Sequence, residues 1–206
     1  MSIYGLLIGI SLVLIWNYFS SQNKIIPKKH EDKFIIFLYL SALFGARIYH
    51  VFDYWSFYSQ NPTHILNIRA GGLGIIGAIL TGIIYVLIYS KKFHHSFLKI
   101  SDIFFKILPL AQSISRFGNY FNRENPAWWL ESFLNFLLFL FLIKKNTNST
   151  AYYLIGYGLI RFFTEFIRDD TWSLSGIKIA QIIALFSINI GLILISHASK
   201  NHSSKK

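Results

Sequence analysis

The sequence predicts an all-α integral membrane protein with seven transmembrane helices, an N-terminus outside and a C-terminus in the cytoplasm. Three observations support this prediction. Of the 206 residues, 53% are hydrophobic and only 14% are charged, whereas a soluble domain carries about 25% charged residues. The apolar residues form runs of membrane-spanning length, and most lysines follow every second run, starting with the first.

The composition also excludes several kinds of site. The chain has no cysteine, which excludes a disulfide framework, a thiolate zinc site and a cysteine nucleophile within it. A net charge of +11 would suggest a nucleic-acid partner for a soluble protein. Here the lysines instead cluster in the connections that follow alternate apolar runs, as in membrane proteins, so we expect no nucleic acid to bind.

Seven apolar runs are candidate spans, at residues 3–19, 34–52, 71–89, 103–121, 128–143, 152–167 and 179–195. Most have the roughly 17 to 25 residues that a bilayer requires, and the first, fifth and sixth are at or just under the short end. The first run has no basic residue before it and no small-residue cleavage pattern after it, so we expect no removable signal peptide. The connections are short, which predicts a single polytopic membrane domain over residues 1–206.

The lysines set the predicted orientation. Twelve of the 20 basic residues are lysines that follow the first, third, fifth and seventh runs: Lys24, Lys28, Lys29, Lys33, Lys91, Lys92, Lys99, Lys144, Lys145, Lys200, Lys205 and Lys206. Because lysine-rich loops stay in the cytoplasm, these connections should be cytoplasmic. This pattern requires an odd number of spans, in agreement with the seven runs.

The arginines lie on the opposite side from these lysines. All six are near the predicted outer ends of the second, third, fourth and sixth runs: Arg47, Arg69, Arg116, Arg123, Arg161 and Arg168. The planar guanidinium group binds phosphate through two parallel hydrogen bonds, so this segregation favours an anionic ligand in the outer leaflet. The alternative is that each arginine reaches the interface or pairs with a carboxylate.

Polar spacing within the runs predicts which arginines face the protein interior. Arg161, Glu165 and Arg168 are spaced i, i+4 and i+7, and Arg116, Asn119 and Arg123 are spaced i, i+3 and i+7. Each set should therefore share one helical face, which must be turned away from lipid. An anionic ligand would balance the positive charge, although a buried ion-pair ladder that only joins helices is the alternative.

Glycines open the third run directly after Arg69 and Ala70, at Gly71, Gly72, Gly74 and Gly77. Without a Cβ atom the backbone can be approached closely, either by another helix or by a lipid head group. Close helix packing is the commoner reason for such a cluster.

Several motifs resemble those of the bacterial prolipoprotein diacylglyceryl transferases. The segment Arg116-Phe-Gly118-Asn119-Tyr-Phe-Asn122-Arg-Glu124 is similar to the signature of that family, and Glu131 follows it at the start of the next run. Further matches occur in the same order along almost the whole chain. They are Tyr4-Gly5-Leu6, Gly45-Ala-Arg47-Ile-Tyr49-His50, the glycines from Gly71 to Gly77, and the segment from Tyr157 to Arg168.

The resemblance implies a transfer reaction in the bacterial cytoplasmic membrane. The diacylglyceryl group of phosphatidylglycerol would move to the lipobox cysteine thiol of a preprolipoprotein signal peptide, forming a thioether and releasing glycerol phosphate, with no cofactor or metal. By position in the motifs, Arg116 and Arg161 would be the catalytic residues that bind the phosphate. The substrate-binding residues would be Tyr4, Gly71, Gly72, Asn119, Asn122, Glu124, Glu165 and Arg168, of which Glu165 and Arg168 would orient the arginines.

The chain differs from many members of this family at three places, one of which is Leu130, where the family usually has a tyrosine before the glutamate. Ile76 stands where many members carry a histidine proposed as general base, which makes His50 a candidate base, unless it is a simple interfacial hydrogen-bonding residue. The external head segment is reduced to residues 125–128. An alternative function is therefore a non-catalytic phospholipid-binding or scaffolding protein derived from the family. A small-anion transporter is a third interpretation, but the paired repeats or broken helices of transporters are not seen in the sequence.

Overall fold

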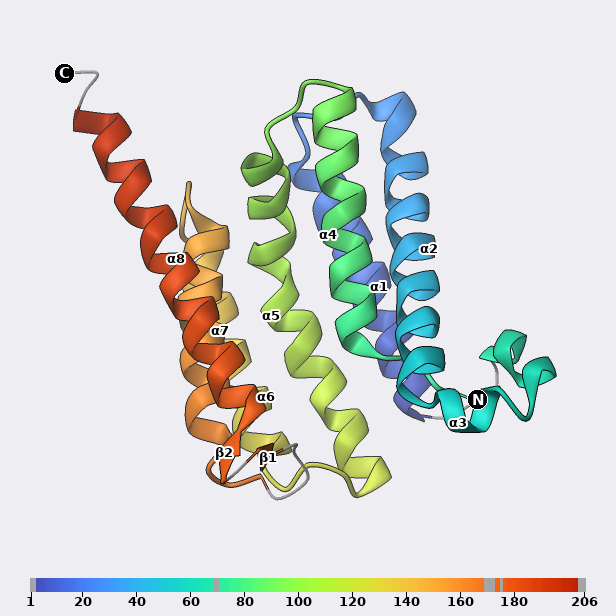
Figure 1. The fold of residues 1–206 in the computed structure, drawn as a ribbon. Coiled ribbons are helices and arrows are strands. Elements are labelled where there is room, and N and C mark those ends of the chain that lie inside the picture. The colour runs from blue at the N-terminus through green and yellow to red at the C-terminus, as the bar shows by residue number, and fades with distance from the viewer. Residues whose placement is uncertain (1–2, 69–70, 169–172, 175, 204–206) are drawn as a thin grey trace. The chain divides into compact units, whose positions relative to one another are not determined.

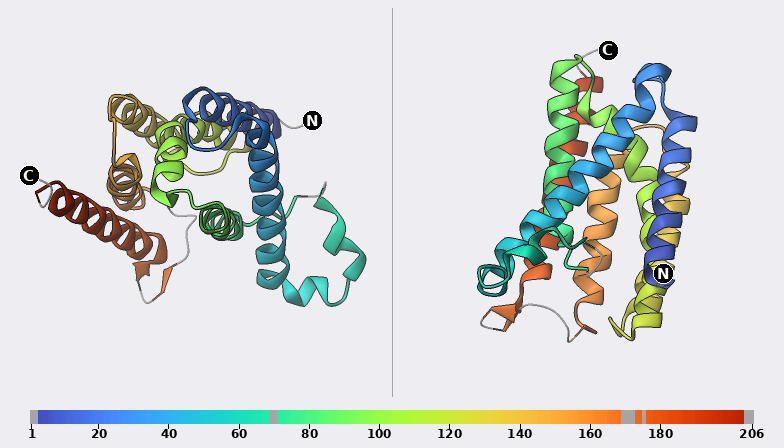
Figure 2. Two further views of the ribbon diagram at one scale, coloured as in Figure 1. Left: turned by 90° about the horizontal axis from the view of Figure 1, so that it is seen from above. Right: turned by 90° about the vertical axis from the view of Figure 1, so that its right-hand side faces the viewer.

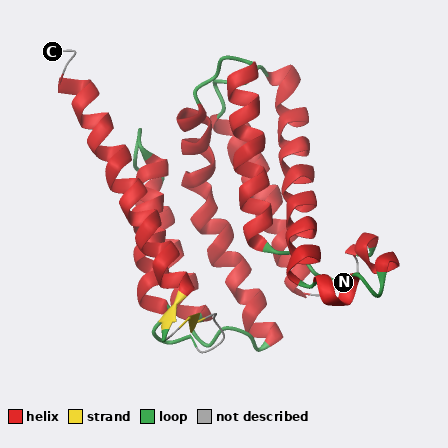
Figure 3. Ribbon diagram, in the orientation of Figure 1, coloured by secondary structure: helices red, strands yellow, loops and turns green. Residues whose placement is uncertain are grey.

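The computed structural model describes residues 3–68, 71–168, 173–174 and 176–203, and these residues are almost entirely helical. The elements in chain order are α1 (Ile3–Gln22), α2 (Lys28–Asp53), α3 (Trp55–Tyr58), the 3₁₀ helix η1 (Pro62–Leu66), α4 (Ile75–Lys92), α5 (Phe97–Asn122), α6 (Trp128–Leu142), α7 (Ser149–Thr164), β1 (Ser173–Leu174), β2 (Ile177–Lys178) and α8 (Ile179–Ser203) (Figures 1 and 3). The strands form a short antiparallel hairpin in which Ser173 pairs with Lys178. The prediction of an all-α protein is confirmed, apart from this hairpin.

The helices pack into two compact units. Residues 24–100, called the inserted unit below, contain α2, α3, η1 and α4. Residues 1–23 and 101–206, called the terminal unit, contain α1, most of α5, and α6 to α8. Each unit is held together by contacts among its own residues.

In the inserted unit, α2 and α4 pack side by side along their length (Figure 2). Glycine makes this contact possible, because a Cβ atom on Gly45 would lie 2.5 Å from the carbonyl oxygen of Gly77. The Thr81 hydroxyl donates to the carbonyl oxygens of Ser41 on α2 (2.8 Å) and of Gly77 (2.9 Å). Of the glycine cluster, Gly77 therefore serves helix packing, as small residues commonly do between membrane helices.

In the terminal unit, α7 lies against both α6 and α8. Small residues again permit the approach of α8, because a Cβ atom on Gly158 would lie 2.9 Å from the Ala184 carbonyl oxygen. Helix α6 contacts α7 through an apolar cluster that includes Leu138, Leu142, Tyr153 and Ile160. The contact of α5 with α6 is partly polar, since the Ser132 hydroxyl donates to the Ser113 carbonyl oxygen at 2.9 Å.

Each of the seven predicted runs forms a helix, and four of the helices are long and apolar enough to cross a membrane: Ile3–Gln22, Lys28–Asp53, Ile75–Lys92 and Ile179–Lys200. Helix α6 is apolar but has 15 residues, and α7 has 16. Helix α5 has 26 residues but contains Lys99, Asp102, Lys106 and Arg116. The chain is therefore a membrane protein, while seven spans and their orientation stay predictions.

Two predicted helix boundaries near the predicted site residues were wrong. The third run does not open at Gly71, because Gly71 and Gly72 have φ values of +87° and +74°, and α4 begins only at Ile75. The sixth helix ends at Thr164, so Arg168 lies beyond α7 rather than two turns along its face. The predicted end of the fourth run agrees with the end of α5 at Asn122, but Arg123 follows with a φ of +56° and does not continue the helical face of Arg116 and Asn119.

Candidate active site

The polar centre of the terminal unit is the side chain of Glu131, in the first turn of α6. This carboxylate is completely buried. Its Oε2 atom lies 2.6 Å from Nε of Arg116, at the end of α5. Its Oε1 atom accepts hydrogen bonds from Nη1 of Arg161 at 3.1 Å and from Nη1 of Arg168 at 3.3 Å. Three guanidinium groups from two helices and one following turn thus meet at a single carboxylate.

Two neutral donors complete the surroundings of Glu131. Nδ2 of Asn125 donates to Oε2 at 3.3 Å, and the Thr164 hydroxyl donates to Oε1 at 3.3 Å. The first turn of a helix also favours a negative charge, because the amide groups there point toward it. A buried carboxylate is tolerated only with such partners, so Glu131 holds the ends of α5 and α7 at the start of α6.

The sequence-based interpretation left Glu131 out of the site, although its position at the start of a span was noted. The i, i+4 and i+7 spacing connects residues within one run only, and Glu131 lies on another helix. The same holds for Asn125, in the connection after α5. Thr164 could have been found from its i+3 spacing from Arg161, but threonine is uncharged and the spacing pattern was built on charged residues.

A second carboxylate, Glu165, lies directly after the last residue of α7 and is also completely buried. Its Oε2 atom is 3.0 Å from Nη2 of Arg161. Neither of its carboxylate oxygens accepts a geometrically aligned hydrogen bond from the part of the chain that the structure describes. The amine of Lys178, in β2, donates to the backbone carbonyl oxygens of Glu165 (2.6 Å) and Arg168. The turn after α7 is thereby tied to the hairpin.

The three arginines at Glu131 keep part of their surface accessible. The side chains of Arg116, Arg161 and Arg168 are 21%, 17% and 13% exposed, whereas the Glu131 side chain is 0% exposed. The carboxylate therefore neutralises the cluster from its buried side. Arg116 and Arg161 each have five N–H donors, more than their described contacts use, so each can also bind an anion such as phosphate.

Asn119 links this cluster to a third acidic residue at the end of α5. Nη1 of Arg116 lies 3.5 Å from Oδ1 of Asn119, and Nδ2 of Asn119 lies 3.4 Å from Oε2 of Glu124. Glu124 and Asn122 are exposed, as is Arg123, which does not share the face of Arg116 and Asn119 as predicted. A chain of polar groups thus extends from buried Glu131 to the surface of the terminal unit.

The Tyr4 ring packs against the same end of α5. A Cβ atom on Gly118 would lie 3.0 Å from Cε2 of Tyr4, so the absence of a side chain at Gly118 makes room for the ring. Gly118 adjoins Asn119 in sequence. The structure therefore places Tyr4, Arg116, Asn119, Glu124, Arg161, Glu165 and Arg168 in or beside one polar cluster of the terminal unit.

Three predicted site residues remain. Asn122 is exposed at the end of α5, and Gly71 and Gly72 belong to the inserted unit. The positive φ values of the two glycines place them in a turn before α4. A Cβ atom on Gly72 would lie 2.6 Å from Nη1 of Arg47 and 2.9 Å from Cε1 of His50. This turn therefore fits closely over the C-terminal part of α2 only because position 72 is glycine.

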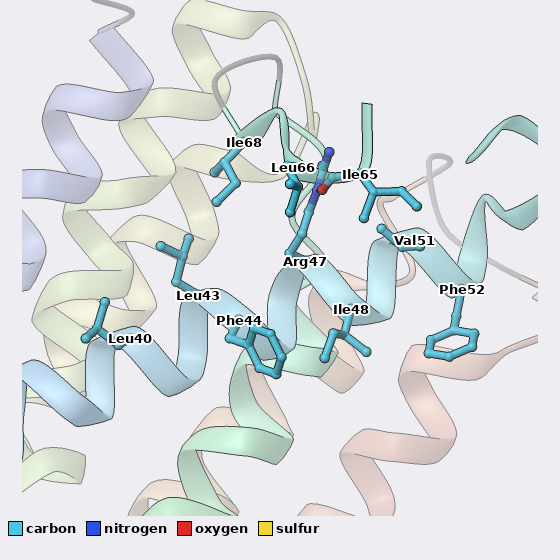
Figure 4. Close-up of a pocket in the computed structure, with 10 residues that line it drawn as sticks. All are labelled: Leu40, Leu43, Phe44, Arg47, Ile48, Val51, Phe52, Ile65, Leu66 and Ile68. Atoms are coloured by element: carbon cyan, nitrogen blue, oxygen red, sulfur yellow. The ribbon is translucent and has the colours of Figure 1, made fainter. Parts of the chain in front are cut away.

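Arg47 is one of the segregated arginines that favoured an anionic ligand, but all its N–H donors are engaged by the backbone. It is 8% exposed and donates five hydrogen bonds, one for each of its N–H groups, to backbone carbonyl oxygens. The acceptors are His64, Ile65, Asn67, Gly71 and Gly72, at 2.6 to 3.2 Å. Figure 4 shows this side chain extending from α2 toward the loop, within a groove of about 460 Å³ that is otherwise apolar.

The candidate base His50 lies beside the same turn. Its Nδ1 atom is 3.3 Å from the Tyr58 hydroxyl, and its ring stacks on Tyr54 at 4.6 Å between centroids. These contacts fit an interfacial hydrogen-bonding residue. Ile76, in the first turn of α4, is 43% exposed. Arg69 lies outside the described residues.

The chain is similar to known proteins over most of its length. A family model described as prolipoprotein diacylglyceryl transferase matches residues 1–197. The phosphatidylglycerol–prolipoprotein diacylglyceryl transferase of Finegoldia magna is 35% identical in an alignment that covers 74% of this chain and 72% of that protein. Proteins of the same name from Clostridium novyi and Clostridioides difficile are 33% and 32% identical, and the alignments cover 98% and 97% of this chain and 94% and 91% of theirs. With its signature residues gathered around Glu131, this chain belongs to the prolipoprotein diacylglyceryl transferase family.

Proposed function

We propose that this membrane protein transfers the diacylglyceryl group of phosphatidylglycerol to the lipobox cysteine thiol of preprolipoproteins. In this reaction the cysteine sulfur attacks the lipid carbon that bears the phosphate oxygen. A C–S bond forms, the C–O bond breaks, and the electron pair of that bond leaves on glycerol phosphate. The proton of the thiol ends on the released phosphate or on water, so the products are a thioether and glycerol phosphate.

The observation that carries the proposal is the set of partly exposed guanidinium groups around a fully buried carboxylate. The departing phosphate gains negative charge as the C–O bond breaks. Arg116 and Arg161 carry fixed positive charges on neighbouring helices and are held by Glu131 at 2.6 Å and 3.1 Å. Charged donors that are already in place stabilise such a transition state without further reorganisation.

The surrounding residues would then position these two arginines and the lipid head group. Glu131 and Glu165 fix the Arg161 guanidinium from two directions, and Arg168 shares the Oε1 atom of Glu131. Asn119 and Glu124 lie where they can donate to and accept from the glycerol head group, and Tyr4 borders the site. Asn122 would contact the head group from the end of α5.

The nucleophile also needs activation, because a free cysteine has a pKa of about 8.5. A thiolate is the reactive form, and the positive charge of nearby guanidinium groups stabilises it. This requirement is met by the same arginines that bind the phosphate.

The proposed location is the outer leaflet of the bacterial cytoplasmic membrane, with seven spans, the N-terminus outside and the C-terminus inside. The segregation of lysines from arginines along the sequence supports this orientation. The lipobox cysteine would then approach from the outer side, where the arginine-bearing ends of α5 and α7 are placed.

The deciding experiment is turnover by the purified protein. It is reconstituted in liposomes that contain phosphatidylglycerol and is given a lipobox peptide, and the peptide is then analysed by mass spectrometry. We expect the mass increase of one diacylglyceryl group on the cysteine, and none when a serine replaces that cysteine. Protection of the protein by phosphatidylglycerol without any adduct would instead support the non-catalytic lipid-binding alternative.

A further inference from the structure

A second groove lies at the other end of the inserted unit, where α2 begins and α4 ends. It has a volume of about 360 Å³ and is lined by residues of these two helices and the adjoining Phe93. Lys33 lies in this groove, and Arg47 is 14 residues further along α2, which corresponds to about 21 Å of helix at 1.5 Å per residue. The groove is thus separate from the turn that carries Gly71 and Gly72.

The mouth of the groove is positively charged. Lys33, Lys92 and His30 are among its lining residues, and all three are exposed. Within residues 24–68 and 71–100, neither Lys33 nor Lys92 forms an ion pair. Two acidic residues precede Lys33 on α2. Glu31 is buried and lies 3.2 Å from the amine of Lys28, and Asp32 is exposed and forms no ion pair within these residues. The two lysines therefore present positive charge at the entrance without an ion-pair partner in the described part of this unit.

Aromatic rings form one wall. Tyr89 lies between Phe34 and Phe93, with centroid distances of 4.6 Å to each, and Tyr85 is 6.2 Å from Tyr89. Phe34 is fully buried and anchors this cluster. Tyrosines of membrane helices concentrate at the level of the lipid head groups, where the ring is apolar and the hydroxyl is hydrated. The cluster therefore marks the membrane interface at this end of α2 and α4.

Deeper along the helices the groove becomes apolar. Its lining includes Phe37 and Ile88, which are 56% and 60% exposed. From the entrance inward, the lining runs from Lys33 to Phe37 along α2 and from Lys92 through Tyr89 and Ile88 to Tyr85 along α4. Positive charge therefore lies at the entrance and aromatic and aliphatic groups lie deeper, which matches a phospholipid, whose phosphate precedes its acyl chains. Free phosphate would have no use for the apolar part.

We propose that this groove binds one anionic membrane phospholipid, with its phosphate between Lys33 and Lys92 and an acyl chain along Phe37 and Ile88. Basic pockets between transmembrane helices are a recurrent way of binding anionic head groups. The site is independent of the transfer reaction, because none of its residues belongs to the cluster around Glu131. The bound lipid would fix the ends of α2 and α4 at the interface.

Photo-cross-linking in the intact protein tests this site. Phe37 is replaced with the photoreactive amino acid p-benzoylphenylalanine, and the protein is placed in nanodiscs of phosphatidylcholine with a minor fraction of phosphatidylglycerol or phosphatidylserine. Phe136 on α6, which is 41% exposed, receives the same replacement as a position in contact with bulk lipid. Cross-linked lipids are identified by mass spectrometry.

We expect both anionic lipids to be enriched at position 37 relative to position 136. A lysine near an anionic lipid contributes roughly fivefold in binding, so two lysines give an enrichment of about 25-fold. The double variant Lys33→Gln/Lys92→Gln should return the ratio to that of bulk lipid. The matched variant Lys24→Gln/Lys99→Gln, which removes the same charge outside the groove, should keep the enrichment.

Three results would overturn the proposal. The first is a bulk lipid ratio at position 37 in the protein with both lysines. The second is an enrichment that survives the Lys33→Gln/Lys92→Gln change. The third is loss of the enrichment on adding inorganic phosphate but not chloride at equal ionic strength, which would indicate a free-phosphate site. Transfer to the lipobox peptide, measured in parallel, should be unchanged by both double variants, so that failure here is distinguishable from failure of the proposed function.

Discussion

Single carboxylates decide the arrangement of the candidate active site. Glu131 is fully buried at the start of α6, and it contacts Arg116, Arg161 and Arg168 at 2.6 to 3.3 Å. An arginine that serves a carboxylate on one side can still bind phosphate on the other, because its planar group has five N–H donors. The structural and the catalytic roles of these arginines are therefore compatible, and substitution can separate them.

Replacement of Arg116 or Arg161 by lysine should keep the charge but lose most of the transfer rate. A lysine amine is a point charge that cannot form two parallel hydrogen bonds to phosphate oxygens. Loss of one such contact in the transition state reduces the rate by about a hundredfold, or about 3 kcal/mol. The measurement is thioether formation per folded protein for Arg116→Lys and Arg161→Lys, with Lys28→Gln as control. Near-normal transfer by both lysine variants would contradict a phosphate-binding role.

Replacement of Glu131 by glutamine should destabilise the protein as well as inactivate it. The change leaves three guanidinium groups around a neutral amide, and breaking a buried ion pair from one side typically costs about 3–5 kcal/mol. Glu124→Gln is the matched control, because Glu124 is exposed and its side-chain hydrogen bond within the described residues is with Asn119. We expect a clearly lower unfolding temperature for Glu131→Gln and little change for Glu124→Gln. Equal unfolding temperatures would show that Glu131 does not hold the helices together.

At the scale of elements, the loop between α3 and α4 depends on one side chain of α2. Arg47 binds five backbone carbonyl oxygens between residues 64 and 72, and its guanidinium carbon also lies 5.2 Å from the centre of the Tyr58 ring. A loop without regular structure needs such partners, because buried carbonyl oxygens without a donor are unfavourable. Arg47 is therefore a positioning residue for Gly71 and Gly72.

The Arg47→Lys variant should loosen this loop, because lysine has at most three donors and a different geometry. We expect faster amide hydrogen exchange over residues 64–68 and 71–74, with the helices α2 and α4 unchanged. Exchange detected by mass spectrometry resolves these segments. Arg123→Lys serves as control, since Arg123 is exposed. Unchanged exchange in the loop would show that the five hydrogen bonds are not needed to order it.

Helix packing in the inserted unit should fail when the contact between two glycines is filled. A Cβ atom on Gly77 would overlap the backbone of Gly45, so Gly77→Ala must push α2 and α4 apart. Overpacking of this kind costs about 1–3 kcal/mol. Gly9→Ala in α1 is the opposite case, because nothing lies within 4 Å of its Cβ position and alanine favours a helix over glycine. The thermal unfolding temperature should therefore fall for Gly77→Ala and stay the same or rise for Gly9→Ala.

At the scale of the whole molecule, the main prediction is the orientation in the membrane. If lysine-rich connections are cytoplasmic, a tag at the N-terminus is accessible to a membrane-impermeant reagent from outside intact cells, whereas a tag after Lys206 is not. Labelling with and without permeabilisation provides the measurement. Two cytoplasmic ends would require an even number of spans and would remove the basis for placing the arginines in the outer leaflet.

The helices could be predicted from the sequence more completely than their ends. Apolar runs of membrane length locate all seven long helices, because burial in lipid depends on composition rather than on a particular partner. The start of α4 and the position of Arg123 were missed because the turns there need residues with a positive φ. Gly71, Gly72 and Arg123 have positive φ values, and in the glycines this freedom looks in sequence like a small-residue helix contact.

The sequence by itself determined that this chain is a helical membrane protein and which family it resembles, and it predicts which arginines bind an anion. Motif order and helical spacing are sufficient for this, because both can be read from the linear sequence without knowing which helices contact one another. Only the tertiary structure decided that Glu131 is shared by Arg116, Arg161 and Arg168, and that Arg47 is engaged by carbonyl oxygens instead of a ligand. The physical reason is that a guanidinium group satisfies its donors with whatever acceptor packing brings near it. That acceptor lies on another helix or in a loop, at a sequence separation that no local period encodes.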